Sequence, residues 1–435
     1  MLEPDERRRL QRRTVVSLAA AQIFSGIGTG SALALGSLMA EEITGSTALA
    51  GTSSLAFSLS GALLGIPLAQ LAQRVGRRTA LTLGLSLAAV GAVLMIAAPL
   101  WGFTTLLVGA FLIGLGNAAN LQARFAATDL AAPERQGRDL SIVMWSVTVG
   151  AVAGPNLIGW GSQLGASLGL PALSGPFLYS LAGLILGIII LQVGLRPDPL
   201  LTARTLLEQG QQAQPNKTVP KRNFLGGLKT IVASPNALLA LIAATIGHFV
   251  MVAVMAMTPV FMRGHAETTA GHDHAAMPDT LQLIGVTISL HIAGMYALSP
   301  LMGWLVDRWG RRQTILLGHV TLVAATLFAG LGRENTVLLV IGLFLLGLGW
   351  SASMVAASAL MGEAVAAQVR PTAQGSLDSM MNFAGVAAAG LSGGLMTLTG
   401  FLGLNLISGA LSVGVVLIVF VGLLKLRAPA SPQLS

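Results

Sequence analysis

The sequence predicts an all-α membrane protein with twelve transmembrane helices, arranged as two pseudo-symmetric bundles of six. Three observations predict this fold: an apolar composition, basic clusters in every second loop, and a repeat between the two halves. Of the 435 residues, 54% are hydrophobic and 10% are charged, whereas soluble domains carry about 25% charged residues. A chain so poor in charge cannot cover a water-facing surface, so most of its surface must face lipid.

A helix that crosses a bilayer needs about 20 apolar residues, and twelve such segments follow one another along the chain. They lie at 14–39, 47–70, 79–99, 101–126, 139–165, 175–195, 236–262, 280–303, 313–331, 336–361, 372–398 and 401–425. The longest polar stretch, 196–235, is interpreted as a cytoplasmic linker between an N-terminal bundle at 1–195 and a C-terminal bundle at 236–435.

The net charge of +8 indicates topology rather than a ligand. Basic residues cluster between alternate apolar segments, and the other loops hold only Arg263 and Arg333. This distribution places both termini and the linker in the cytoplasm. We therefore expect a multi-pass protein of a bacterial inner membrane, a monomer in contact with lipid and not with nucleic acid. The absence of cysteine excludes disulfides and thiolate metal sites.

Two stretches repeat at nearly one offset. GAFLIGLGNAAN, beginning at Gly109, matches GLFLLGLGWSAS, beginning at Gly342, in seven of twelve positions, an offset of 233. RVGRR at Arg74 matches RWGRR at Arg308 at an offset of 234. A duplicated six-helix unit explains both matches, and such repeats place the substrate site near the membrane midplane between the halves.

The second of these loops resembles the signature of the major facilitator superfamily. Its residues are Gly303, Asp307, Arg308, Gly310, Arg311 and Arg312. The resemblance implies the major facilitator fold and a cytoplasmic gate at these residues. In the first copy Ala69 and Gln73 replace the usual Gly and Asp, so the second copy is expected to be the stronger half of the gate.

Histidine and methionine concentrate in one region of the chain. Five of the six histidines lie within the 44 residues from His248 to His291, and seven of the sixteen methionines lie between Met251 and Met302. Met251 and Met255, like His291 and Met295, are four residues apart, so each pair shares one helix face. At 1.5 Å per residue, Met251 and His291 both lie roughly 16 Å from the external ends of their helices.

This arrangement predicts a ladder of metal ligands across the midplane, with His248 as an accessory ligand. Thioethers are soft, neutral ligands that suit Cu(I) and bind Zn(II), Mn(II) or Mg(II) poorly. The external loop would collect the metal through His265, His272, His274 and Met277. Ordinary packing also places methionine in apolar helices, whereas an ionisable residue such as His291 inside a membrane is rare and usually functional.

The pair of motifs, MVAVM at Met251 and HIAGM at His291, resembles that of the CcoA-type copper importers. The resemblance implies copper as transported substrate, bare or as a small complex, with import that supplies cytochrome oxidase assembly. It assigns metal binding to Met251, Met255, His291 and Met295. No cofactor is expected.

Other functions stay open. Gln22, Asn117, Asn120 and Asn156 could bind a small organic substrate such as riboflavin, or could form bonds between helices. A metal receptor that does not transport is a third possibility. Multidrug efflux is less favoured because no Asp or Glu lies in the core of a predicted helix. No nucleophile–base set or Gly-rich phosphate loop points to an enzyme or to ATP-driven transport.

Overall fold

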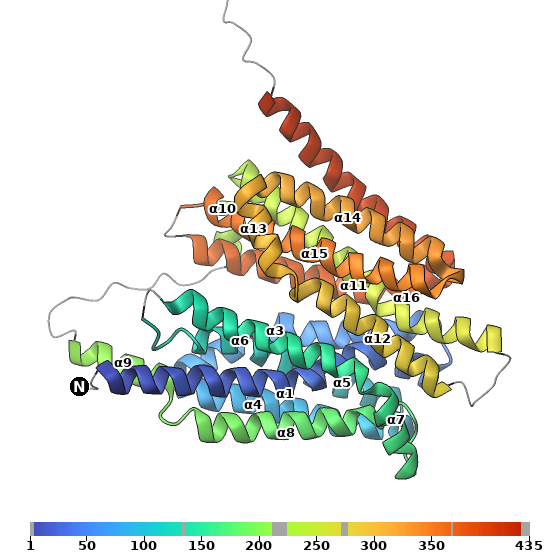
Figure 1. The fold of residues 1–435 in the computed structure, drawn as a ribbon, viewed down its shortest axis with the longest axis horizontal. Helices are drawn as coiled ribbons and strands as arrows, with labels where there is room; N and C mark the ends of the chain where they lie inside the picture. Colours follow the sequence, from blue (N-terminus) through green and yellow to red (C-terminus); the bar gives the residue numbers. More distant parts are fainter. Residues whose placement is uncertain (1–3, 133–134, 211–223, 271–276, 367–368, 428–435) are drawn as a thin grey trace, which may run out of the picture. The chain divides into compact units, whose positions relative to one another are not determined.

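A computed structural model describes residues 4–132, 135–210, 224–270, 277–366 and 369–427. Those residues form helices joined by short turns, and they contain no strand (Figure 1). The helices are α1 Pro4–Thr44, α2 Thr47–Ala50, α3 Thr52–Val75, α4 Arg77–Trp101, α5 Phe103–Ala126, α6 Gln136–Asn156, α7 Ile158–Ser167, α8 Pro176–Gly194, α9 Pro199–Gly210, α10 Phe224–Val232, α11 Pro235–Ala270, α12 Met277–Tyr296, α13 Ser299–Trp309, α14 Arg311–Leu331, α15 Thr336–Ala364 and α16 Arg370–Arg427.

Ten helical stretches of the described residues are long and apolar enough to cross a membrane, and the pair α6 and α7, bent by 53°, gives an eleventh span. The helix α16 is two helices joined at Gly400, whose φ of 71° is not helical, and this division gives a twelfth. The predicted all-α membrane fold is therefore confirmed.

Two predicted segments are broken helices. The segment 139–165 bends after Pro155, which has no N–H to donate and whose ring disturbs the preceding turn. The segment 280–303 is interrupted at residues 297–298, between α12 and α13. Pro300 cannot donate to the carbonyl of Tyr296, four residues earlier, and the Ser299 hydroxyl donates to that carbonyl instead at 2.8 Å.

The chain divides into two compact units that do not follow the order of the sequence. Unit 1 comprises Met1–Pro220, Ala256–Ile292 and Ala389–Thr397, and unit 2 comprises Lys221–Met255, Ala293–Ala388 and Leu398–Ser435. The predicted division at 195 and 236 stays a prediction. The predicted linker 196–235 holds two short helices, α9 and α10.

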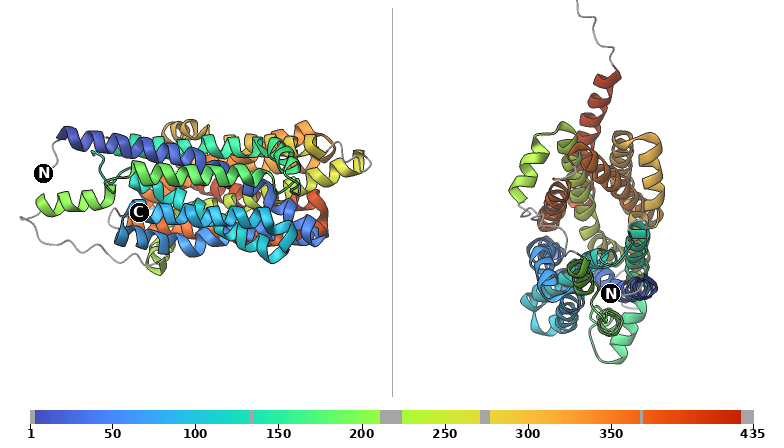
Figure 2. Two further views of the ribbon diagram at one scale, coloured as in Figure 1. Left: turned by 90° about the horizontal axis from the view of Figure 1, so that it is seen from below. Right: turned by 90° about the vertical axis from the view of Figure 1, so that its left-hand side faces the viewer.

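The repeated stretches occupy equivalent places in the two units. Gly109 begins its repeat on α5, which packs extensively against α4, and Gly342 begins its repeat on α15, which packs in the same way against α14 (Figure 2). Gly76 precedes α4 with a φ of 94°, and Gly310 precedes α14 with a φ of 99°. This left-handed conformation favours glycine, so the repeated glycine turns the chain at the same point of each half.

Candidate functional site

The four predicted copper ligands are turned into the protein and away from lipid. On α11, Met251 is 4% exposed and Met255 is 7% exposed; on α12, His291 is fully buried and Met295 is 7% exposed. Each pair has both members on a buried face, as the four-residue spacing predicts. The three methionines belong to unit 2, and His291 belongs to unit 1. Binding of one ion by all four side chains stays a prediction.

The predicted collecting loop is described only in part. His265 is exposed near the end of α11 and stacks on Phe261, with 5.9 Å between ring centroids. Met277 begins α12, and its side chain lies outside the described residues, as do His272 and His274 entirely. Among the described residues, no three His, Cys, Asp or Glu side chains gather in one place.

His248, the predicted accessory ligand, has another partner. The indole Nε1–H of Trp350 donates to Nδ1 of His248 at 3.1 Å. Trp350 also meets the ring of Tyr296 edge-on, with 5.8 Å between centroids. His248 is therefore part of an aromatic cluster in unit 2, and its Nδ1 lone pair is already used.

His319 is a buried histidine that the sequence analysis passed over. It lies on α14 and is fully buried, with Nε2 3.2 Å from the Ala243 carbonyl and 3.2 Å from the Ser353 hydroxyl. It stands apart from the histidine cluster in sequence, which is why composition did not draw attention to it. Its position inside an apolar span was the available signal, since ionisable groups are rare there.

Three of the four amides considered for an organic substrate form contacts between helices, and for the fourth, Asn117, that role stays a prediction. Gln22 donates to the Asn120 carbonyl at 2.9 Å, and the Asn120 amide oxygen accepts from Ser25 at 2.9 Å. Asn156 on α6 donates to the Ser289 hydroxyl on α12 at 2.7 Å. These bonds use the amides to hold helices together, as the alternative interpretation predicted. Gln22 and Asn120 also line a small pocket.

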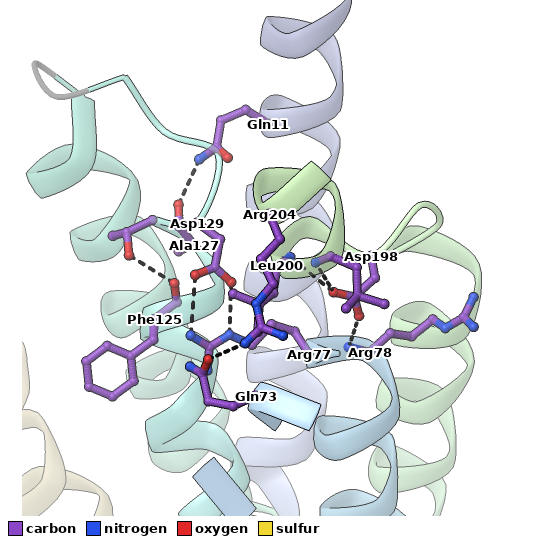
Figure 3. A network of polar contacts seen from close by, with 12 residues as sticks. Gln11, Gln73, Arg77, Arg78, Phe125, Ala127, Asp129, Asp198, Leu200 and Arg204 are labelled. Atoms are coloured by element: carbon purple, nitrogen blue, oxygen red, sulfur yellow. Dashed lines mark hydrogen bonds and ion pairs between the residues drawn. The ribbon is translucent and has the colours of Figure 1, made fainter. Parts of the chain in front are cut away.

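The loop between α3 and α4 carries a network of charges (Figure 3). Arg77 donates to both carboxylate oxygens of Asp129, at 2.9 and 3.3 Å, and both side chains are nearly buried. Burial raises the pKa of Asp129 above its ordinary value, and the Arg77 guanidinium opposes that rise. Asp198 accepts from the backbone N–H of Arg78 at 2.7 Å and from that of Leu200 at 3.0 Å, so it caps both α4 and α9.

The predicted gate in the second half is more exposed. Arg311 forms an ion pair with Glu363 at 2.6 Å and lies 3.9 Å from Asp307. Gly303 has open space beside it, and Gly310 caps the C-terminal end of α13. The guanidinium of Arg308 lies over the Trp304 ring, 5.3 Å from the ring centroid. Arg312 donates to Asn236 on α11. The first copy holds the more buried ion pair, and which copy is the stronger half of the gate stays a prediction.

The fold, with its bundle of apolar spans and its two related loops, defines a multi-pass membrane transporter. The Major Facilitator Superfamily matches residues 18–278 and 268–435, so the chain belongs to this superfamily.

Two relatives extend over nearly the whole chain. An uncharacterized MFS-type transporter of Bacillus subtilis, YdeG, is 35% identical over 418 residues, 94% of this chain and 91% of that protein. The riboflavin transporter RfnT of Brucella anthropi is 28% identical over 396 residues, 91% of this chain and 92% of that protein.

Solved structures share the fold at low identity. The nucleoside transporter NupG aligns with a TM-score of 0.69 at 14% identity, covering 94% of this chain and 98% of its own. A bacterial homolog of the human lysosomal transporter Spinster aligns with a TM-score of 0.70 at 17% identity, covering 97% of this chain and 99% of its own. These likenesses show the fold alone.

Proposed function

We propose that copper is the cargo of this secondary transporter, bound by the methionine and histidine side chains of α11 and α12. The observation that supports the proposal is the burial of all four, at most 7% exposed. Apolar methionines that only fill a membrane helix can face lipid equally well, whereas ligands of a transported ion must face the protein interior. Three thioethers and one imidazole form a soft, neutral set that suits Cu(I).

In this proposal Met255 receives the ion first, Met251 and His291 hold it near the midplane, and Met295 passes it on. Import through the bacterial inner membrane, cytoplasmic termini and a role in cytochrome oxidase assembly follow from the resemblance to the CcoA-type importers and from the positive-inside pattern. The superfamily moves its cargo by rocking two halves around a central site. The charged loops at Arg77 and Arg311 are the candidate gates on the side of the termini.

Uptake of a small organic molecule is the second candidate. The 28% identity to a riboflavin transporter favours it. Three of the four amides first considered for such a site, Gln22, Asn120 and Asn156, are engaged between helices. Of that set, Asn117 stays the candidate for an organic substrate.

Uptake of radioactive copper into cells that express each variant at the same level in the membrane distinguishes the two candidate functions. The variants are Met255→Leu and His291→Ala, and the control is Met302→Leu, a methionine of α13 that is equally buried, at 4% exposed, but outside both motifs. We expect the first two to lose at least about tenfold in uptake, since even outer-shell changes at metal sites cost 10–100-fold. Full uptake in Met255→Leu and His291→Ala would overturn the copper proposal.

A further inference from the structure

Three aromatic side chains from three helices of unit 2 form one cluster. His248 lies on α11, Tyr296 ends α12 and Trp350 lies on α15. The Trp350 ring is 6.1 Å from the His248 ring and 5.8 Å from the Tyr296 ring, between centroids. All three side chains are partly exposed, although His248 and Trp350 lie near the middle of long apolar helices. The cluster therefore presents ring surface inside the span.

The hydrogen bond from Trp350 sets the chemistry of His248. An indole N–H can only donate, so Nδ1 of His248 must be the unprotonated nitrogen and Nε2 carries the hydrogen. Within the described part of the chain, no acceptor takes a hydrogen bond from Nε2, and none engages the Tyr296 hydroxyl. His248 thus holds a neutral, oriented donor that lacks a partner, in a medium where unused polar groups are costly.

Gly385 on α16 keeps space beside this donor. A Cβ atom added at Gly385 would lie 3.1 Å from Nε2 of His248 and 3.3 Å from its Cδ2. Such contacts are tighter than ordinary van der Waals packing, so any side chain at this position would crowd the nitrogen. The space beside Nε2 of His248 therefore depends on residue 385 being a glycine.

Tyr296 stands where the helix is interrupted, immediately before residues 297–298. The duplicated sequence provides no second copy of the cluster: Asn117 occupies the position that corresponds to Trp350 in the repeat. The aromatic cluster is a specialisation of the second half.

We propose that this cluster binds a neutral, flat heteroaromatic molecule that carries a hydrogen-bond acceptor at the edge of its ring. The acceptor takes the hydrogen bond from Nε2 of His248, and the ring packs against Trp350 and Tyr296, an arrangement that aromatic groups favour. A cation would gain from the rings but would be repelled by the N–H of His248. Apart from His248, the predicted accessory ligand, this site shares no residue with the copper ladder, and it does not depend on copper being transported.

The test is direct binding to the purified, detergent-solubilised protein. Riboflavin is the first probe of the neutral heteroaromatic class, and its fluorescence anisotropy reports binding. Uridine is a second neutral probe, whose binding is measured by calorimetry. Ethidium is the cationic probe for comparison. We expect saturable binding of riboflavin or uridine, and weaker binding of ethidium. His248→Ala and Gly385→Ala should each weaken binding at least tenfold, because one removes the donor and the other covers it.

Two further variants separate a binding role from a structural one. His248→Gln keeps an N–H donor and should recover part of the affinity, while Trp309→Phe, an exposed tryptophan on α13, should bind as the wild type does. Each variant must elute as a monodisperse protein. Absence of saturable binding by both neutral probes, or affinities unchanged in His248→Ala and Gly385→Ala, would overturn the proposal. The Met255→Leu variant, which tests copper uptake, should still bind riboflavin or uridine. A failure of the copper proposal would therefore be distinguished from a failure of this one.

Discussion

At the scale of single residues, equivalent ion pairs in the two halves differ in burial. Arg77 pairs with Asp129 and Arg311 pairs with Glu363, and both partners are related by the repeat offset of 234. The side chains of the first pair are 7% and 11% exposed, and those of the second are 30% and 55% exposed. The same interaction therefore has different energetic consequences, because water screens the second pair.

Arg77→Ala is expected to lower the free energy of unfolding by about 3–5 kcal/mol, since it leaves a carboxylate buried without its partner. Arg311→Ala should cost at most about 1 kcal/mol, as exposed ion pairs do. Unfolding of the solubilised protein in a denaturing detergent measures both, and Arg74→Ala, an exposed neighbour, is the control. Equal losses in Arg77→Ala and Arg311→Ala would contradict the role given to burial.

At the scale of secondary-structure elements, α6 and α12 approach closely within unit 1. Ser289 on α12 donates to the Val152 carbonyl on α6 at 2.7 Å, and a Cβ at Gly285 would lie 2.1 Å from the Pro155 carbonyl oxygen. The bend after Pro155 and the glycine on the facing helix together permit this contact. Close packing through small residues, with polar bonds beside it, is typical of membrane helices.

Gly285→Val should therefore destabilise the protein by about 1–3 kcal/mol, the usual cost of overfilling a packed contact. Gly264→Val, at a glycine of α11 with open space beside it, should be close to neutral. Thermal unfolding of the two variants, side by side with the wild type, checks the difference. A Gly285→Val protein as stable as Gly264→Val would show that the helices separate at little cost.

At the scale of the whole molecule, the chain is a transporter whose segments must move during its cycle. Residues 256–292 and 389–397 are joined to residues 1–220 in one compact unit, although they belong to the second half of the sequence. The Asn156–Ser289 hydrogen bond and the 2.7 Å ion pair between Arg263 and Glu42 are two of the contacts that join them. Rocking of repeats around a central site requires such contacts to open.

A cross-link between α6 and α12 should stop transport. The chain has no cysteine, so Asn156→Cys combined with Ser289→Cys introduces a single thiol pair for a short, reducible cross-linker. Uptake by cross-linked cells is expected to fall to background and to return after reduction, while either single variant should be insensitive to the reagent. Undiminished uptake by the cross-linked protein would mean that this contact persists throughout the cycle.

Much of the fold was predictable because its determinants are local. Hydropathy over about twenty residues locates each span, and the repeat of the Arg74 and Arg308 loops relates the halves without any knowledge of packing. The interruption at residues 297–298 was not predicted, since that segment is as apolar as an unbroken helix and only Pro300 signals the change. For the candidate site, the spacing of Met251 and Met255 was enough to place both on one buried face.

The sequence by itself thus determined the transmembrane spans, the duplicated loops and the shared faces of the methionine and histidine pairs, because these depend on periodicity along one helix. Only the tertiary structure decided which polar groups meet: Arg77 with Asp129, 52 residues apart, and Trp350 with His248, 102 residues apart. Such contacts depend on how far each helix is rotated and how closely it approaches its neighbours. Those quantities follow from the packing of all helices together.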